Sequence, residues 1–315
     1  MFAVQRRTGA TGPARHRRGL VLALAIMAPL GLVAAVVAGP ATAAALPAIP
    51  STVPGPPSGW TSVFSDDFNG SSGAAPSSVN WVHDTGTGFG TGEIETMTSS
   101  TANTHLDGNG NLDITALRAG NGSWTSGRVH TPTANVGAPA GGKLEVIASI
   151  KQPNPGSGIG YWPAFWMLGN GQWPENGEID IMEDVNARSQ VSGTIHCGTD
   201  PGGPCNEGNG IGSGLHACGG CQTGYHTYSM ILDRSNTSAE KITFYLDGSS
   251  YFSVSESKVG ASTWKQAYDH NLDIIFDLAM GGAYPNGVCG CTSPSGSTSS
   301  GATMNVAYVA AYKTG

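Results

Sequence analysis

The sequence predicts an all-β protein, either a sandwich or a barrel of short antiparallel strands. Three observations lead to this fold class. Apolar and polar residues alternate over many short stretches, glycine contributes 47 of the 315 residues, and helical periodicity is nearly absent. Glycine favours turns, and regularly spaced short strands without helices pack as two sheets or close into a barrel. Composition does not separate these two architectures.

The first 43 residues form a separate unit. Five arginines precede an apolar run at residues 20–37, and the small residues at 41–43 fit a signal-peptidase site. We therefore expect residues 1–43 to be a signal peptide and the mature protein to be secreted. A membrane anchor is the alternative, but Pro29 and Gly31 interrupt the apolar run. The sequence does not decide between the general and twin-arginine export routes.

The charge of the mature chain limits its partners. Residues 1–43 hold five of the fifteen basic residues and no acids, which leaves ten basic against 22 acidic residues and a formal charge of −12. Such a protein is a poor partner for nucleic acid or an anionic membrane, whereas a neutral polysaccharide is compatible with it. Residues 44–59 contain five prolines and are expected to be a linker. We expect residues 60–315 to form one monomeric domain.

Strand signals follow one another along this domain. The clearest alternation is at residues 111–117, and Asp247-Gly248 predicts a tight turn between two strands. One helix of a turn or two is expected at 261–268. The other expected strands are 143–150, 193–197, 228–233, 242–246, 272–279 and 306–312.

The most informative segment is Gly-Glu-Ile-Asp-Ile-Met-Glu at residues 177–183. Its three acids lie in an apolar run that should be a buried strand, where uncompensated carboxylates are costly. Side chains alternate along a strand, so Glu178 and Asp180 share a face and Glu183 points away. A β-bulge at residue 181 or 182 would return Glu183 to the shared face. The two glutamates could then approach to about 5–6 Å, which suits a retaining glycosidase.

Aromatic residues surround these acids. The run Gly-Tyr-Trp-Pro-Ala-Phe-Trp-Met-Leu at 160–168 places Trp162 and Trp166 on one face, and Tyr161 and Phe165 on the other. Trp173 precedes the acid strand. Flat rings stack on the C–H faces of sugars, and acids beside such rings suit glycoside cleavage. We expect one face to bind substrate and the other to enter the core.

These segments resemble glycoside hydrolase family 16, in its laminarinase-like (endo-β-1,3-glucanase) branch. The resemblance extends in order over residues 60 to 313, and the acid strand with its tryptophan context is the most specific part. It implies a two-sheet β-jelly-roll sandwich with a concave substrate cleft. Further matching segments are Phe64-Ser-Asp-Asp-Phe-Asn-Gly70, Thr125-Ser-Gly-Arg128, Gly193-Thr-Ile-His196, His226-Thr-Tyr228, Tyr245-Leu-Asp-Gly248 and Asp277-Leu-Ala-Met-Gly-Gly282.

The resemblance also implies residue roles. Glu178 would be the nucleophile, Glu183 the general acid/base, and Asp180 would hold the nucleophile through a shared hydrogen bond. Arg128 matches a position that contacts sugar, although it could instead pair with a structural acid such as Glu145. The expected substrate-binding residues are Glu93, Arg128, Trp162, Trp166, Trp173, His196 and Tyr284, the last of which replaces the family's usual Trp.

No cofactor is expected to be required. The final strand of the family usually carries an Asp that helps to bind a structural calcium ion, and this chain has Ala307 there. This disfavours calcium, although Asp66 or Asp67 and backbone oxygens could still contribute.

The six cysteines all follow the acid strand. An even count in an exported chain favours disulfides, and six cysteines allow fifteen pairings that the sequence leaves open. The alternative is a zinc site supplied by two closely spaced pairs. The cysteines are Cys197, Cys205, Cys218, Cys221, Cys289 and Cys291, and the last four would form that zinc site.

The functional hypothesis is a secreted, endo-acting, retaining β-1,3-glucanase that cleaves laminarin-type glucan. Three alternatives stay open. The same chemistry could act on mixed-linkage β-1,3-1,4-glucan or on a β-galactan. The chain could be a non-catalytic β-glucan-binding protein on the same fold, or a metalloprotein built on the cysteines. Linkage preference and product length are not determined by the sequence.

Overall fold

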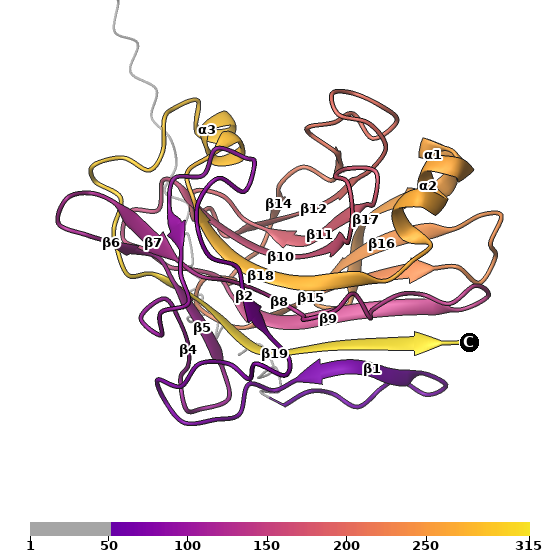
Figure 1. Ribbon diagram of the computed structural model, residues 1–315, viewed down its shortest axis with the longest axis horizontal. Helices are drawn as coiled ribbons and strands as arrows, with labels where there is room; N and C mark the ends of the chain where they lie inside the picture. The colour runs from indigo at the N-terminus through magenta and orange to yellow at the C-terminus, as the bar shows by residue number, and fades with distance from the viewer. Residues whose placement is uncertain (1–51) are drawn as a thin grey trace, which may run out of the picture. The chain divides into compact units, whose positions relative to one another are not determined.

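Two antiparallel eight-stranded sheets pack face to face in residues 52–315, the part of the chain that the computed structural model describes (Figure 1). The predicted all-β sandwich is confirmed, and a single closed barrel is not formed. The first sheet has the order β17 (Ser249–Ser255), β16 (Lys241–Leu246), β15 (His226–Asp233), β9 (Lys143–Lys151), β19 (Thr303–Thr314), β5 (Leu112–Thr115) and β4 (Thr104–Leu106), with β1 (Thr61–Asp66) paired to β19.

The second sheet carries the acid strand. Its order is β13 (Ile211–Gly212), β12 (Gln190–His196), β11 (Glu178–Glu183), β10 (Tyr161–Gly169), β18 (Leu272–Met280), β8 (Arg128–His130) and β2 (Val82–His83), with β14 (His216–Ala217) paired to β12. A small third sheet consists of β3 (Thr96–Met97), β7 (Trp124–Ser126) and β6 (Leu117–Arg118).

The hydrophobic core lies between the two large sheets. β10 and β18 pair in continuous register from Tyr161↔Met280 to Gly169↔Leu272, and all of β18 is buried. Phe165 stacks on Phe276 with ring centroids 4.8 Å apart. Burying one such side chain contributes about 1.5–3 kcal/mol. These two strands therefore form the rigid centre of the sheet that carries the acids.

The predicted elements are present with small changes of boundary. The predicted helix is α2 (Ala261–Tyr268), and the turn after β16 has positive φ at both Asp247 (49°) and Gly248 (73°). This is the geometry that two-residue hairpins favour. Two short helices were not predicted, α1 (Glu256–Val259) and α3 (Ala283–Cys289). The sequence of α3 contains a proline and a glycine, which normally argue against a helix.

The predicted signal peptide, residues 1–43, lies outside the described residues, as do residues 44–51 of the predicted linker. Residues 52–59 contain no strand or helix, and the carbonyl of Pro54 accepts a hydrogen bond from the Tyr312 hydroxyl. Within residues 52–315, none of the helices has the length and apolar character needed to cross a membrane.

Candidate active site

The acid strand β11 contains the predicted bulge. Asp180 pairs with Thr194 of β12, and Glu183 pairs with Ser192. Between these two pairs the chain advances by three residues on β11 but by only two on β12, so β11 contains one extra residue. The pairing with β10 shows the same irregularity, and it leaves Ile181 as the extra residue. The register predicted from the positions of the acids is therefore confirmed.

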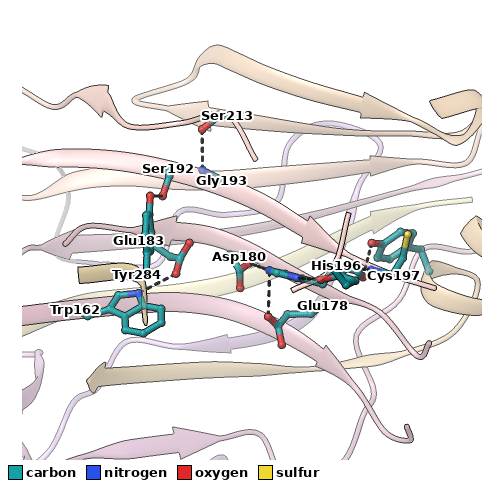
Figure 2. Close-up of polar contacts among 12 residues, drawn as sticks. Trp162, Glu178, Asp180, Glu183, Ser192, Gly193, His196, Cys197, Ser213 and Tyr284 are labelled. Atoms are coloured by element: carbon teal, nitrogen blue, oxygen red, sulfur yellow. Dashed lines mark hydrogen bonds and ion pairs between the residues drawn. The ribbon is translucent and has the colours of Figure 1, made fainter. Parts of the chain in front are cut away.

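The bulge places the apolar side chains of β11 on one face of the strand and its three acids on the other. Ile179, Ile181 and Met182 all enter the main core, because the extra residue places two consecutive apolar side chains there. The three acids of β11 instead pair with Ala164, Trp166 and Leu168 of β10, which belong to a second cluster away from the main core. Figure 2 shows Asp180 between Glu183 and Glu178.

At one end of this row, His196 is surrounded by carboxylates (Figure 2). Its Nε2 lies 3.3 Å from Asp180 Oδ2 and 3.7 Å from Glu178 Oε1. Its Nδ1 lies 2.6 Å from Oε2 of Glu207. Burial by itself lowers the pKa of His196, but hydrogen bonds to Asp180 and Glu207 outweigh burial and raise the pKa to about 11. His196 is therefore a cation at neutral pH.

At the other end, Glu183 has an aromatic environment. Trp162 Nε1 donates a hydrogen bond of 2.8 Å to Glu183 Oε1, and the Tyr284 ring meets the Trp162 ring edge-on at 5.8 Å. The Tyr284 hydroxyl lies 3.1 Å from Ser192 Oγ. Trp162 and Tyr284 thus lie beside one carboxyl group, as a sugar-stacking platform requires.

The two glutamates have different electrostatic environments. Burial and then the nearby Asp180 raise the pKa of Glu178 to about 8, while His196 and Arg128 oppose the rise. Burial and then Asp180 raise the pKa of Glu183 well above its ordinary value, and the Trp162 hydrogen bond only partly opposes them. The contact with His196 therefore favours ionisation of Glu178, whereas Glu183 has no such contact and its surroundings favour the protonated form.

Arg128 and Trp166 are linked to structural partners. The Arg128 guanidinium lies over the Phe89 ring at 4.6 Å and over the Trp166 ring at 4.7 Å. Its Nε is 2.9 Å from Asp84 Oδ2, so the suggested pairing with Glu145 is wrong. The reason is that the two residues lie in different sheets. Arg128 is on β8 of the acid-bearing sheet, whereas Glu145 is on β9 of the other sheet. Trp166 Nε1 donates a 2.7 Å hydrogen bond to an oxygen of Asp277.

Two more predicted residues lie at this face. Trp173 is 37 % exposed, and its ring centroid lies 5.7 Å from that of His196. Glu93 forms a β-bridge with Gly281, and its Oε2 accepts a 3.0 Å hydrogen bond from the Thr91 backbone N–H. Gly282 has φ 95°, and a Cβ there would meet the Glu93 nitrogen and the Trp162 ring, each at 3.2 Å. Glycine is thus needed where the Glu93 loop approaches Trp162.

Sequence analysis missed three residues of this site: Asp84, Phe89 and Glu207. Asp84 and Phe89 lie in loops without any pattern that points to Arg128. Glu207 had a weak signal, because it follows Cys205 by two residues. That signal could be used only once the Cys197–Cys205 pairing was known.

The six cysteines form three local disulfides: Cys197–Cys205, Cys218–Cys221 and Cys289–Cys291. Cys218 and Cys221 also lie near His226, with donor atoms within 4.8 Å of one another. Because these cysteines are bridged, they offer no thiolate to zinc, and the predicted zinc alternative is wrong.

Oxygen donors for other metals are also occupied. Glu178, Asp180 and His196 place one donor atom each within 4.8 Å of one another, and both ring nitrogens of His196 already face carboxylate oxygens. Of the acids considered for calcium, Asp66 accepts hydrogen bonds from the Phe68 backbone, Asn80 and Trp81. The expectation that calcium is disfavoured stays a prediction.

One face of the β-sandwich carries a bulged strand with two glutamates, and a tryptophan lies beside them. This arrangement is typical of glycoside hydrolases that use two carboxyl groups. A family model described as "XgeA-like, catalytic GH16 domain" matches residues 142–229. The crystal structure of endo-1,3-β-glucanase from Streptomyces sioyaensis is similar, with a TM-score of 0.80 and 47 % identity over 84 % of this chain and 99 % of that chain. The chain belongs to glycoside hydrolase family 16, in its endo-1,3-β-glucanase (laminarinase) branch.

Two further relatives are more distant in sequence. Glucan endo-1,3-β-glucosidase A1 of Niallia circulans is 28 % identical over 285 residues, which are 81 % of this chain and 38 % of that protein. β-Glucanase of Rhodothermus marinus is 29 % identical over 258 residues, or 71 % of this chain and 77 % of that protein. The chain thus spans less than half the length of the first of these two relatives.

Proposed function

We propose that this protein is a secreted, endo-acting, retaining β-1,3-glucanase whose substrate is laminarin-type glucan. The observation that carries the proposal is the bulge in β11, which brings Glu178, Asp180 and Glu183 to one face. The similarity to a Streptomyces endo-1,3-β-glucanase over nearly that whole chain supports the choice of linkage. The polysaccharide also suits the acidic charge of the mature chain.

In the proposed mechanism, Glu178 attacks the anomeric carbon while Glu183 protonates the leaving glycosidic oxygen. The cationic His196 at 3.7 Å favours the ionised form of Glu178 that this attack requires. Glu183, whose pKa is raised by burial and by Asp180, supplies the proton. Glu183 then accepts a proton from water, which releases the sugar from Glu178. Two displacements restore the β-configuration.

Substrate binding is proposed to use the aromatic side chains along the same face. Trp162 and Tyr284 lie beside Glu183, and Trp173 lies beside His196, so rings are available at both ends of the acid row. The Arg128 stack with Phe89 and Trp166 would extend this surface, together with Glu93. Such stacking orients the sugar rings, while the acids carry the chemistry.

The proposal is tested by measuring reducing-sugar release from laminarin, curdlan, lichenan, agarose and β-1,3-galactan. We expect laminarin to be the preferred soluble substrate and its products to be oligosaccharides of mixed length. Preference for lichenan or a galactan would move the activity to the alternative substrates. Binding to laminarin without release of reducing ends would instead indicate the non-catalytic alternative.

Proton NMR of early hydrolysis tests the mechanism. A retaining enzyme must release β-configured reducing ends before mutarotation, because each displacement inverts the anomeric centre once. An α-anomer as the first product would contradict the assigned roles of Glu178 and Glu183.

Secretion is a separate part of the proposal and rests on residues 1–43. The full chain is expressed in an actinobacterial host, and the protein in the medium is examined by intact mass and N-terminal sequencing. We expect a mature N-terminus at Ala44. Full-length protein that stays with the membrane fraction would favour the anchor.

A further inference from the structure

Glu207 is a buried carboxylate that the double displacement does not use. Its side chain has no exposed surface, and it lies between β12 and β13, just after the loop that the Cys197–Cys205 bridge closes. Both of its oxygens have partners. Oε1 accepts a 2.8 Å hydrogen bond from the backbone N–H of Cys197, and Oε2 lies 2.6 Å from Nδ1 of His196.

These contacts determine where the protons of His196 lie. The Cys197 N–H can only donate, so it occupies one oxygen of Glu207 and fixes the carboxylate. The other oxygen faces His196 Nδ1 and requires a proton there. On the far side of the ring, Nε2 faces the carboxyl oxygens of Asp180 at 3.3 Å and Glu178 at 3.7 Å. With acceptors at both nitrogens, the imidazole is satisfied only when both carry hydrogen.

We propose that Glu207 is a positioning residue that holds His196 as an imidazolium beside Glu178 and Asp180, and so favours the ionised form of the nucleophile. The role given to Glu178 rests on the proposed function, whereas the protonation of His196 does not. The arrangement is a chain of three elements: a loop carboxylate, an imidazolium, and the pair of carboxyls on β11. Glu207 is not in contact with Glu178 or Glu183. Its own negative charge raises the pKa of Glu178, but by less than the charge of His196 lowers it, so the favourable effect of Glu207 acts through His196.

Within the described part of the chain, no other cation contacts the groups around His196. The Tyr268 hydroxyl of α2 donates a 2.8 Å hydrogen bond to the His196 carbonyl, and the Trp173 ring is uncharged. Arg128, which stacks on Trp166, also lowers the pKa of Glu178, but its guanidinium is already bound to Asp84. His196 is only 13 % exposed, so solvent screens its charge weakly.

The first experiment uses the unaltered protein. NMR of protein labelled with 15N at histidine, with the His196 signals assigned by their loss in His196→Gln, follows the ring nitrogens from pH 5 to pH 10. We expect both nitrogens of His196 to stay protonated beyond pH 8. Conversion to a neutral ring between pH 6 and pH 7, as in an unperturbed histidine, would overturn the proposal.

The second experiment removes the charge. Glu207→Gln keeps the size of the side chain, but its NH2 group must face either the Cys197 N–H or the protonated Nδ1 of His196, and NH2 cannot accept from either. We expect its His196 to lose its proton at lower pH than in the unaltered protein. We also expect kcat/KM on laminarin to fall about 10- to 100-fold, as when a carboxylate behind a functional histidine is removed, and the acidic limb of its pH profile to move up by about one pH unit.

Two further variants separate this role from a structural one. Asp200→Asn removes an acid from the same disulfide loop, where it is exposed, and should change neither the His196 titration nor the pH profile. Glu207→Asp keeps the charge and should restore much of the His196 protonation. If Glu207→Gln lowers the melting temperature but leaves the His196 titration and the acidic limb unchanged, Glu207 only anchors the loop and the proposal is wrong.

The failure of the proposed function would look different. If the unaltered protein hydrolyses no member of the polysaccharide panel, the glucanase proposal fails. The NMR titration of His196 still decides the present inference, because it requires no substrate. A neutral His196 in a fully active enzyme would overturn the inference alone.

Discussion

The two ends of the acid row are built in opposite ways. Glu178 and Asp180 share the imidazolium of His196, and Glu207 holds that ring from behind, so this end is a chain of alternating charges. Among residues 52–315, no cation contacts the Glu183 carboxyl group, and its one side-chain hydrogen bond comes from Trp162. The difference teaches that one strand can favour ionisation of one carboxyl and protonation of another when different loops surround its two ends.

Glu178→Gln tests the end that carries the nucleophile and should have the largest effect. We expect a loss of at least about 1,000-fold in kcat with the fold intact, because no carboxylate remains to form the glycosyl-enzyme. Glu145→Gln, on β9 of the other sheet, is the matched control. Near-normal activity of a folded Glu178→Gln protein would remove the mechanism.

Trp162→Phe tests the other end. The ring is kept but the N–H that stabilises ionised Glu183 is lost, so we expect kcat to fall about 10- to 100-fold. The same loss raises the pKa of Glu183 further, and the alkaline limb of the pH–rate profile should move to higher pH. Trp166→Phe loses a bond to Asp277 instead and should leave that limb in place. Equal movement in both variants would mean that the bond to Glu183 is irrelevant.

The disulfides allow each end to be loosened separately. Cys197–Cys205 closes the loop before Glu207, whereas Cys289–Cys291 lies at the end of α3, which carries Tyr284. With sequence separations of 8 and 2 residues, the chain-entropy model assigns them about 2.5 and about 1 kcal/mol.

Replacing both cysteines of each pair by serine should therefore lower the melting temperature by about 5–10 °C for the first pair and about 2–4 °C for the second. Calorimetry measures the difference. Only the first pair should also move the acidic limb of the pH profile. An equal effect of both pairs on that limb would contradict a special link between the first loop and His196.

The smallest expected effect is on stability as a function of pH. The pKa of Glu178 rises from 4.5 to about 8 on folding, mainly through burial, so the folded protein binds this proton more tightly than the unfolded chain does. The contribution is fully present below pH 4.5 and is lost as the pH rises toward 8. Glu178→Gln cannot titrate, so its melting temperature should fall less between pH 5 and pH 8 than that of the unaltered protein.

Glu95 and Asp184 have pKa values raised by burial to about 8 and about 7, so they titrate over the same range. Both remain in Glu178→Gln, and the difference between the two proteins therefore isolates Glu178. Parallel melting curves at every pH would show that Glu178 is not protonated in the folded state.

The acid row was predictable because its chemistry is local. Ile179, Ile181 and Met182 must be buried, three carboxylates cannot join them, and only a bulge satisfies both demands within one strand. The alternation in β10 likewise separated Trp162 and Trp166 from Tyr161 and Phe165, and the family resemblance indicated which pair faces the acids. The sequence could not decide between zinc and disulfides, because the spacing of two cysteines does not show whether they are oxidised to a disulfide.

The sequence by itself thus determined the fold class, the bulged strand and the three acids, since each depends on side-chain alternation over a few residues. Only the tertiary structure decided that Asp84 binds Arg128, that Cys197 pairs with Cys205, and that Glu207 holds His196. These contacts join segments whose separation in sequence says nothing about their distance in space. They depend on strand order and loop closure, which are properties of the whole sandwich rather than of any local pattern.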